Sequence, residues 1–144
     1  MLHLIGTWKM EKPAVTNIQK YSLLFGGKFI QSKTRAVFSP TAERPKGEIH
    51  EDLNIFSYDG GSGTLTLRSF YTEGFVNIFT LSEVSADGRV LTFTTRAVEN
   101  APDGTKAKLI LRKINDTQMK EEFFVAWPHK EFACIANNHF TKVK

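Results

Sequence analysis

The chain of 144 residues lacks the features of a disulfide-linked, membrane-spanning or secreted protein. Its single cysteine, Cys134, excludes an internal disulfide and a zinc site built from several cysteines. The longest wholly apolar runs span a few residues, well short of the roughly 20 that a membrane-spanning helix needs. The first ten residues lack the charged start and long apolar stretch of a signal peptide. We therefore expect a cytoplasmic protein without membrane insertion.

Clustered positive charge is also absent. The net charge of +4 comes from basic residues spread along the chain, without a run of five or more. A nucleic-acid-binding surface concentrates its charge on one face, so we expect no nucleic-acid partner. Hydrophobic residues at 41% and charged residues at 24% are typical of a globular protein, and the length suits one domain over 1–144. The oligomeric state stays open, a homodimer included.

Apolar and polar residues alternate along most of the chain. In 28–38, Ile30, Ala36 and Phe38 share one face, whereas Lys33 and Arg35 share the other. This period of two predicts strands, because successive side chains of a strand point to opposite faces. The expected strands are 3–11, 28–38, 49–58, 63–72, 75–83, 89–98, 106–114, 117–127 and 130–143.

Turn sequences such as Asp59-Gly-Gly-Ser-Gly63 and Asp87-Gly88 separate these strands at short intervals. Neighbours in sequence are therefore expected to pair antiparallel. The exception is 13–27, where Thr16 or Asn17 can cap a short helix that runs to Phe25. The fold class we expect is all-β: a closed antiparallel up-and-down barrel of nine to ten strands, with one short helix after the first strand.

Several motifs carry a family resemblance. Gly6-Thr-Trp8 resembles the Gly-x-Trp signature of the calycins, which include lipocalins and fatty-acid-binding proteins. This resemblance implies that Trp8 closes one end of the barrel beneath the first and last strands. Further segments resemble an uncharacterised bacterial lipocalin-like family: Phe25-Gly-Gly-Lys-Phe-Ile30, His50-Glu-Asp52, Phe56-Ser-Tyr-Asp59, Arg68-Ser-Phe70 and Glu73-Gly-Phe-Val-Asn77. That family implies a barrel with a cavity, but no particular ligand.

The chain is also distantly similar to nitrobindin-type haem barrels, which place a His ligand near the end of the last strand. His139 lies at about that place, so the resemblance implies haem as a candidate cofactor. By alternation His139 belongs to the face opposite Phe140 and would point outward. A one-residue shift, such as a bulge at Asn137-Asn138, would turn it inward.

Charged residues on two expected strands are further candidates. His50 and Asp52 share a strand face, and a His–carboxylate pair can act in acid–base chemistry or can simply be solvated. Arg68, Glu73 and Asn77 belong to one expected hairpin. If Arg68 points inward, it needs a carboxylate such as Glu73 or Asp52, or an anionic ligand, because a buried charge must be paired. If it points outward, a cross-strand salt bridge is expected.

The aromatic content, 12% with twelve Phe, can fill a barrel or line an apolar cavity. We expect non-catalytic binding of a small apolar or amphipathic molecule inside the barrel, with no metal site. Three alternatives stay open: haem or another tetrapyrrole bound through His139, an enzyme that uses His50 and Asp52, and a barrel packed solid. The expected ligand-binding residues are Trp8, His50, Asp52, Arg68, Glu73, Asn77, Asn138 and His139.

Overall fold

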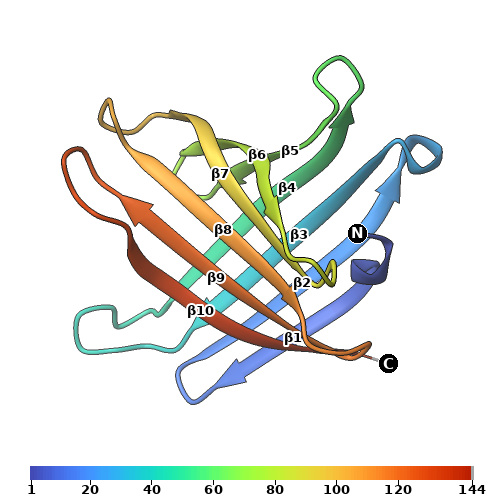
Figure 1. Ribbon diagram of the computed structural model, residues 1–144. Coiled ribbons are helices and arrows are strands. Elements are labelled where there is room, and N and C mark those ends of the chain that lie inside the picture. Colours follow the sequence, from blue (N-terminus) through green and yellow to red (C-terminus); the bar gives the residue numbers. More distant parts are fainter. Residues whose placement is uncertain (144) are drawn as a thin grey trace.

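The computed structural model describes residues 1–143, whose ten strands form a closed antiparallel barrel (Figure 1). Each strand pairs with its neighbours in sequence, and the first pairs with the last. The all-β up-and-down barrel expected from the alternation is therefore confirmed. The strands are β1 (Gly6–Lys12), β2 (Val15–Leu24), β3 (Phe29–Phe38), β4 (Glu48–Asp59), β5 (Thr64–Tyr71), β6 (Val76–Val84), β7 (Val90–Glu99), β8 (Lys106–Lys113), β9 (Gln118–Ala126) and β10 (Ala133–Lys142).

The helix expected after the first strand is wrong. Residues 15–24 form β2, which pairs with β3 along its whole length. The only helical turn there within the described part of the chain is the 3-10 turn η2 (Phe25–Gly27). The alternation of a strand is present, since Asn17, Gln19 and Tyr21 are buried and Ile18 and Lys20 are exposed. Because most of the buried row is polar, the usual apolar signal of a strand is missing.

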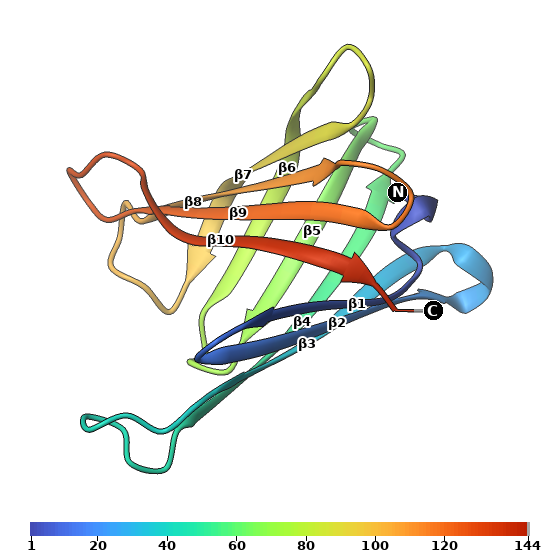
Figure 2. The same cartoon turned by 90° about the horizontal axis from the view of Figure 1, so that it is seen from below.

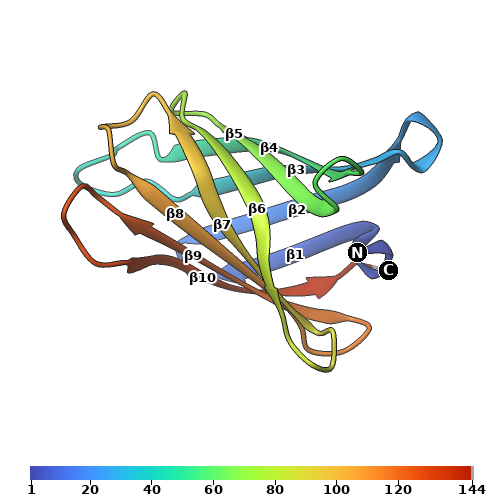
Figure 3. The same ribbon diagram turned by 45° about the horizontal axis from the view of Figure 1, so that its top comes forward.

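The barrel has two different ends. The 3-10 turn η1 (Leu2–Leu4) and the β2–β3, β4–β5, β6–β7 and β8–β9 connections lie at one end, which we call the closed end. The other five connections lie at the opposite, open end, on the left in Figure 2. Figure 3 shows β2–β5 on one side of the barrel and β7–β10 on the other. Among the described residues, no helix is long and apolar enough to cross a membrane.

The closed end is packed solid. Large side chains from strands all around the barrel are at most 1% exposed there: Trp8, Leu67, Phe79, Phe93 and Phe140. Trp8 Nε1 donates a hydrogen bond of 2.7 Å to the Leu4 carbonyl of η1. The tryptophan therefore ties the N-terminal turn to the barrel and closes this end, as the Gly-x-Trp resemblance implies.

The seam between β1 and β10 is short. Only Trp8↔Lys142 and Lys9↔Thr141 are paired there among the described residues, whereas β1 and β2 pair over seven positions. Toward the open end, a side chain links the two strands in place of backbone pairing: Lys12 Nζ donates to the Asn137 carbonyl at 3.1 Å. The barrel wall is thus joined least firmly along this line.

Candidate functional site

The inward-facing side chains change character halfway along the barrel. On β4, Phe56 is 3% exposed in the packed half, and Asn54, Asp52 and His50 follow on the same face toward the open end. On β9 the buried Met119 is followed on the same face by Glu121. Beyond this level the side chains no longer fill the barrel, and a cavity with two lobes begins.

The apolar lobe has a volume of about 340 Å³. That volume falls in the range of small-molecule sites, roughly 300–1,000 Å³. Its wall comes largely from the β5–β6 connection, β6–β10 and the connections between them, with Phe75, Val98, Ala107, Val125 and Trp127 among the lining residues. Asn77 is a buried polar residue in this wall, and its Nδ2 donates to Tyr71 Oη at 3.2 Å.

The polar lobe has a volume of about 190 Å³ and lies against β2, β3 and β4. Its distinguishing lining residues are Asn17, Gln19, Thr34, Asn54, Glu121 and Asn138. The two lobes meet where four residues line both: His50, Asp52, Tyr71 and Phe123. The rings of Tyr71 and Phe123 stack at this boundary, with centroids 6.1 Å apart. A ligand longer than one lobe would therefore pass Asp52.

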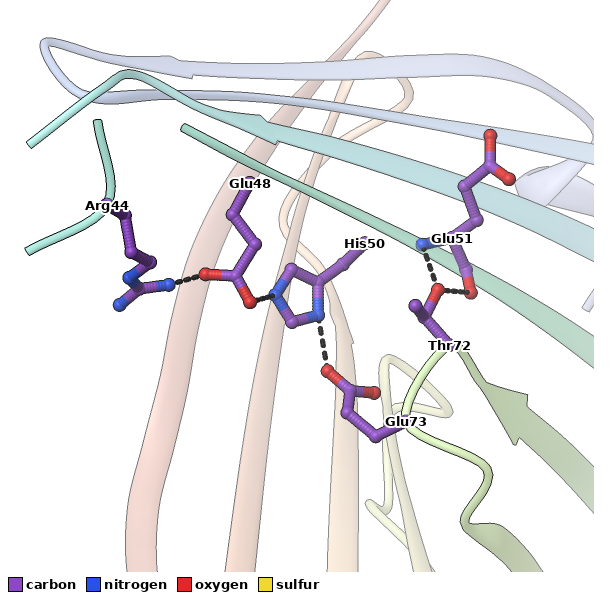
Figure 4. Close-up of polar contacts among 6 residues, drawn as sticks. All are labelled: Arg44, Glu48, His50, Glu51, Thr72 and Glu73. Atoms are coloured by element: carbon purple, nitrogen blue, oxygen red, sulfur yellow. Dashed lines mark hydrogen bonds and ion pairs between the residues drawn. The ribbon is translucent and has the colours of Figure 1, made fainter. Parts of the chain in front are cut away.

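His50 is held between two carboxylates at the mouth (Figure 4). Its Nε2 lies 2.6 Å from Glu48 Oε1, and its Nδ1 lies 2.5 Å from Glu73 Oε1. Both ring nitrogens of the imidazole therefore have a carboxyl partner. Glu48 also pairs with Arg44 of the β3–β4 connection. The network therefore fastens two mouth connections to β4.

A second contact fixes the same rim. The Glu51 backbone N–H donates to Thr72 Oγ1, and Thr72 Oγ1 donates to the Glu51 carbonyl, both at 2.7 Å. The Glu51 side chain itself points away from the His50 network (Figure 4). Its Oε1 lies 3.4 Å from Arg35 Nε, and both side chains are largely exposed. Glu51 thus belongs to the outer face of β4, as the alternation predicts.

Two carboxyl groups lie deeper, at the polar lobe. Burial raises the pKa of Asp52 to about 6, with a smaller contribution from Glu73 and a partial offset by His50. Burial also raises the pKa of Glu121, although a hydrogen bond from Gln19 Nε2 at 3.1 Å opposes the shift. Tyr21 Oη donates to Gln19 Oε1 at 3.2 Å and orients that amide. The interior therefore carries carboxyl groups that are costly to ionise.

Neither protein-family models nor curated proteins contain a match to this chain. Among residues 1–143, no cluster of three or more His, Cys, Asp or Glu side chains is arranged to hold a metal ion.

The structure brings five of the eight sequence-predicted site residues to the cavity: His50, Asp52, Glu73, Asn77 and Asn138. The pairing inside the site differs from the expectation. His50 contacts Glu48 and Glu73, which occupy both ring nitrogens, so neither nitrogen is free to exchange a proton with a molecule beside Asp52. This geometry gives no support to a catalytic pair of His50 and Asp52.

Arg68 lies outside the cavity. It pairs with Ile55 and Ile78 on the outer face of β4–β6, and its Nη1 donates to Ser57 Oγ at 3.2 Å and Thr66 Oγ1 at 3.3 Å. The inward residues of β5 are Leu67, Ser69 and Tyr71 instead. Arg68 therefore offers no anchor for an anionic ligand inside the barrel, and the expected cross-strand salt bridge is replaced by hydroxyl contacts.

Trp8 and His139 also lie away from the cavity. Trp8 is part of the packed closed end. His139 is exposed on the outer face and pairs with Lys120, while Asn138 and Phe140 point inward. A register shift does occur in β10, but between Cys134 and Ala136, too early to turn His139. A tetrapyrrole inside the barrel could not use this histidine as a ligand.

Sequence reasoning missed Glu121, Asn17 and Gln19. Glu121 alternates with Lys120 and Glu122 in the same row as Met119 and Phe123. A carboxylate inside an otherwise apolar row is the signal that could have found it. Burying such a charge lowers stability, so its presence there indicates a functional role. Asn17 and Gln19 were hidden by the expectation of a helix over their segment.

Proposed function

We propose that the barrel binds a small amphipathic molecule in the two-lobed cavity and does so without transforming it. The observation that carries this proposal is that side chains fill the barrel interior in the closed half but not in the open half. Side chains such as Phe79 and Phe93 leave no space in the closed half, whereas a cavity of about 340 Å³ stays open beside Ala107 and Val125. A barrel that served only as a scaffold would gain stability from filling this volume.

The lining supports an amphipathic ligand. Burial of an apolar body against the first lobe contributes roughly 25 cal/mol for each Å² removed from water. The polar groups of the second lobe would orient the other end of the same molecule. The Gly6-Thr-Trp8 resemblance to lipocalin-like barrels is consistent with this assignment, because that family resemblance implies a cavity within the barrel.

The test uses a ligand whose only polar group is neutral. Naphthylmethanol is titrated into the protein in a calorimeter, and saturable binding is expected. Ala107→Phe places a ring in the apolar lobe and is expected to weaken binding by about tenfold or more, since even ~1.4 kcal/mol of lost contact is tenfold in affinity. Ala107 is 2% exposed and lines this lobe, so the added ring competes directly with the ligand.

Ala97→Phe is the matched control, because Ala97 is exposed and pairs with Ile78 on the outer face. This variant should bind like the unchanged protein. Circular dichroism spectra establish that both variants are folded. Absence of naphthylmethanol binding, or equal binding by both folded variants, would refute a site in this lobe. Native mass spectrometry of the freshly purified protein provides the complementary measurement of a ligand retained from the cell.

A further inference from the structure

The charged residues that line the two lobes are nearly all acidic. They are His50, Asp52, Glu73 and Glu121, and within residues 1–143 no Lys or Arg lines either lobe. Lys12 stands on the rim, where its Nζ donates to the Asn137 carbonyl and, at 3.5 Å, to Asn138 Oδ1. The interior of a protein with a net charge of +4 is thus selectively negative.

His50 does not balance this interior charge. The imidazole lies between Glu48 and Glu73, at 2.6 Å and 2.5 Å, so both of its nitrogens already have carboxyl partners outside the polar lobe. Asp52 and Glu121 remain, and no ion pair joins either of them to a basic side chain in the described chain. Buried charges are normally paired, and a cation beside these two carboxyl groups would offset the cost that burial places on their ionised form.

Asn17 gives an independent indication. Its side chain is 7% exposed, it lines the polar lobe, and its Oδ1 has no hydrogen-bond partner. A buried acceptor without a partner is unfavourable, and a ligand that donates a hydrogen bond to it would remove this cost. The carboxyl groups of Asp52 and Glu121 add acceptors beside Asn17 when they are ionised, with Glu121 already accepting one hydrogen bond from Gln19 Nε2. A primary ammonium group supplies three N–H donors and one positive charge.

We propose that the ligand is a small primary amine with an aromatic or similarly apolar body. Its ammonium group is held in the polar lobe by Asp52, Glu121 and Asn17, and its body fills the apolar lobe. This inference rests on the proposed function and specifies the class of ligand.

The boundary between the lobes fits such a molecule. Asp52 lines both lobes, so an ammonium group beside it can extend its attached body into the apolar lobe. Tyr71 and Phe123 lie at the same boundary, and aromatic faces attract cations. A ligand that carries a carboxylate would instead meet two acidic side chains with no cation to offset the repulsion.

The experiment compares three probes that share one ring system: naphthylmethylamine, naphthylmethanol and naphthoic acid. Each is titrated calorimetrically at about pH 7.5, where the amine is protonated and the acid ionised. The amine is expected to bind about tenfold or more tightly than the alcohol, as one charge-assisted hydrogen bond is worth about 1.5–3 kcal/mol, or at least tenfold. The acid should bind more weakly than the alcohol.

Variants locate the source of the preference. Asp52→Asn and Glu121→Gln keep the size of the side chains and remove their charge, so each should reduce the preference for the amine while leaving alcohol binding nearly unchanged. Glu51→Gln is the matched control, since Glu51 is the next residue on β4 but faces outward to Arg35 at 3.4 Å. This control should keep the full preference.

The outcomes separate the two proposals. If the alcohol binds and the amine binds no better, the amine inference fails while the proposed function stands. The inference also fails if Glu51→Gln removes the preference as strongly as Asp52→Asn, because the effect would then be one of overall charge. If none of the three probes binds, both proposals fail.

Discussion

The two halves of the barrel follow opposite rules, although the same ten strands run through both. In the closed half the inward residues are large and apolar, as with Phe79 and Phe93 at 0% exposed. In the open half, inward positions of the same sheet hold Asp52, Glu121 and Asn17 around a cavity. Strands such as β2, β3 and β4 pair without interruption across this boundary, so the difference between the halves lies in the side chains that these strands turn inward.

The difference shows how one sheet divides two tasks. Apolar packing in the closed half supplies the free energy of folding, because buried hydrocarbon is the main favourable contribution to stability. The open half keeps a cavity and buried carboxyls, both of which lower stability. The packing of the closed half therefore compensates for the stability that the cavity and the buried carboxyls of the open half cost.

The largest expected effect comes from truncating one aromatic in each half. Phe79→Ala leaves a void in a solid core and should lower the free energy of unfolding by about 3–5 kcal/mol. Phe123→Ala enlarges an existing cavity and should cost about 1–2 kcal/mol. Chemical denaturation of both variants measures the contrast. Equal losses would mean that the open half is as important to stability as the closed half.

A smaller effect concerns the charge of Asp52, whose pKa rises from 3.8 to about 6 in the folded protein. Below pH 3.8 the carboxyl is neutral in both states. Between pH 3.8 and about 6 the unfolded chain has lost this proton while the folded protein keeps it, so stability falls across this window and stays at the lower level above about pH 6. The shift corresponds to about 3 kcal/mol, which screening at this partly exposed group reduces to about 1–2 kcal/mol.

Asp52→Asn should therefore be about 1–2 kcal/mol more stable than the unchanged protein at about pH 7.5, and the gain should vanish near pH 4. Urea denaturation at both pH values tests this expectation. The groups that face Asp52, namely His50, Glu73, Tyr71 and Glu121, are common to both proteins. A gain that persisted at low pH would assign the effect to something other than ionisation.

The smallest expected effect is at His139. This side chain is exposed on the outer face, so His139→Ala should change the free energy of unfolding by no more than about 0.5 kcal/mol. It should also leave the affinity for naphthylmethanol unchanged. Denaturation and calorimetry measure the two quantities, and absorption spectra after addition of hemin extend the comparison. A Soret band that depends on His139 would place a haem site on the barrel surface.

The sequence predicted the closed half well. Rows such as Leu91 and Phe93, or Leu109 and Leu111, alternate with more polar neighbours, and this pattern alone indicates strands with a buried face. The nine expected strands match nine of the ten observed strands in position, and the confirmed barrel follows from their short connections.

The open half was harder to predict because many of its inward residues are polar. Strand β2 was taken for a helix because its inner row, Asn17 and Gln19 before Tyr21, lacks an apolar signal. The direction of Arg68 was undecided because both rows of β5 mix polar and apolar residues, so alternation could not tell inside from outside. His50 and Asp52 were found since two ionisable residues on one strand face are conspicuous.

The two paired positions of the β1–β10 seam have a consequence for motion of the barrel wall. Local opening there breaks the fewest backbone hydrogen bonds, because the cost of separating two strands grows with the length of their ladder. Beyond Lys9 toward the open end, the junction is carried by the Lys12 side chain. We therefore expect β1 and β10 to separate before any other pair of neighbouring strands. Such an opening would let a ligand that is too wide for the open end enter the barrel from the side.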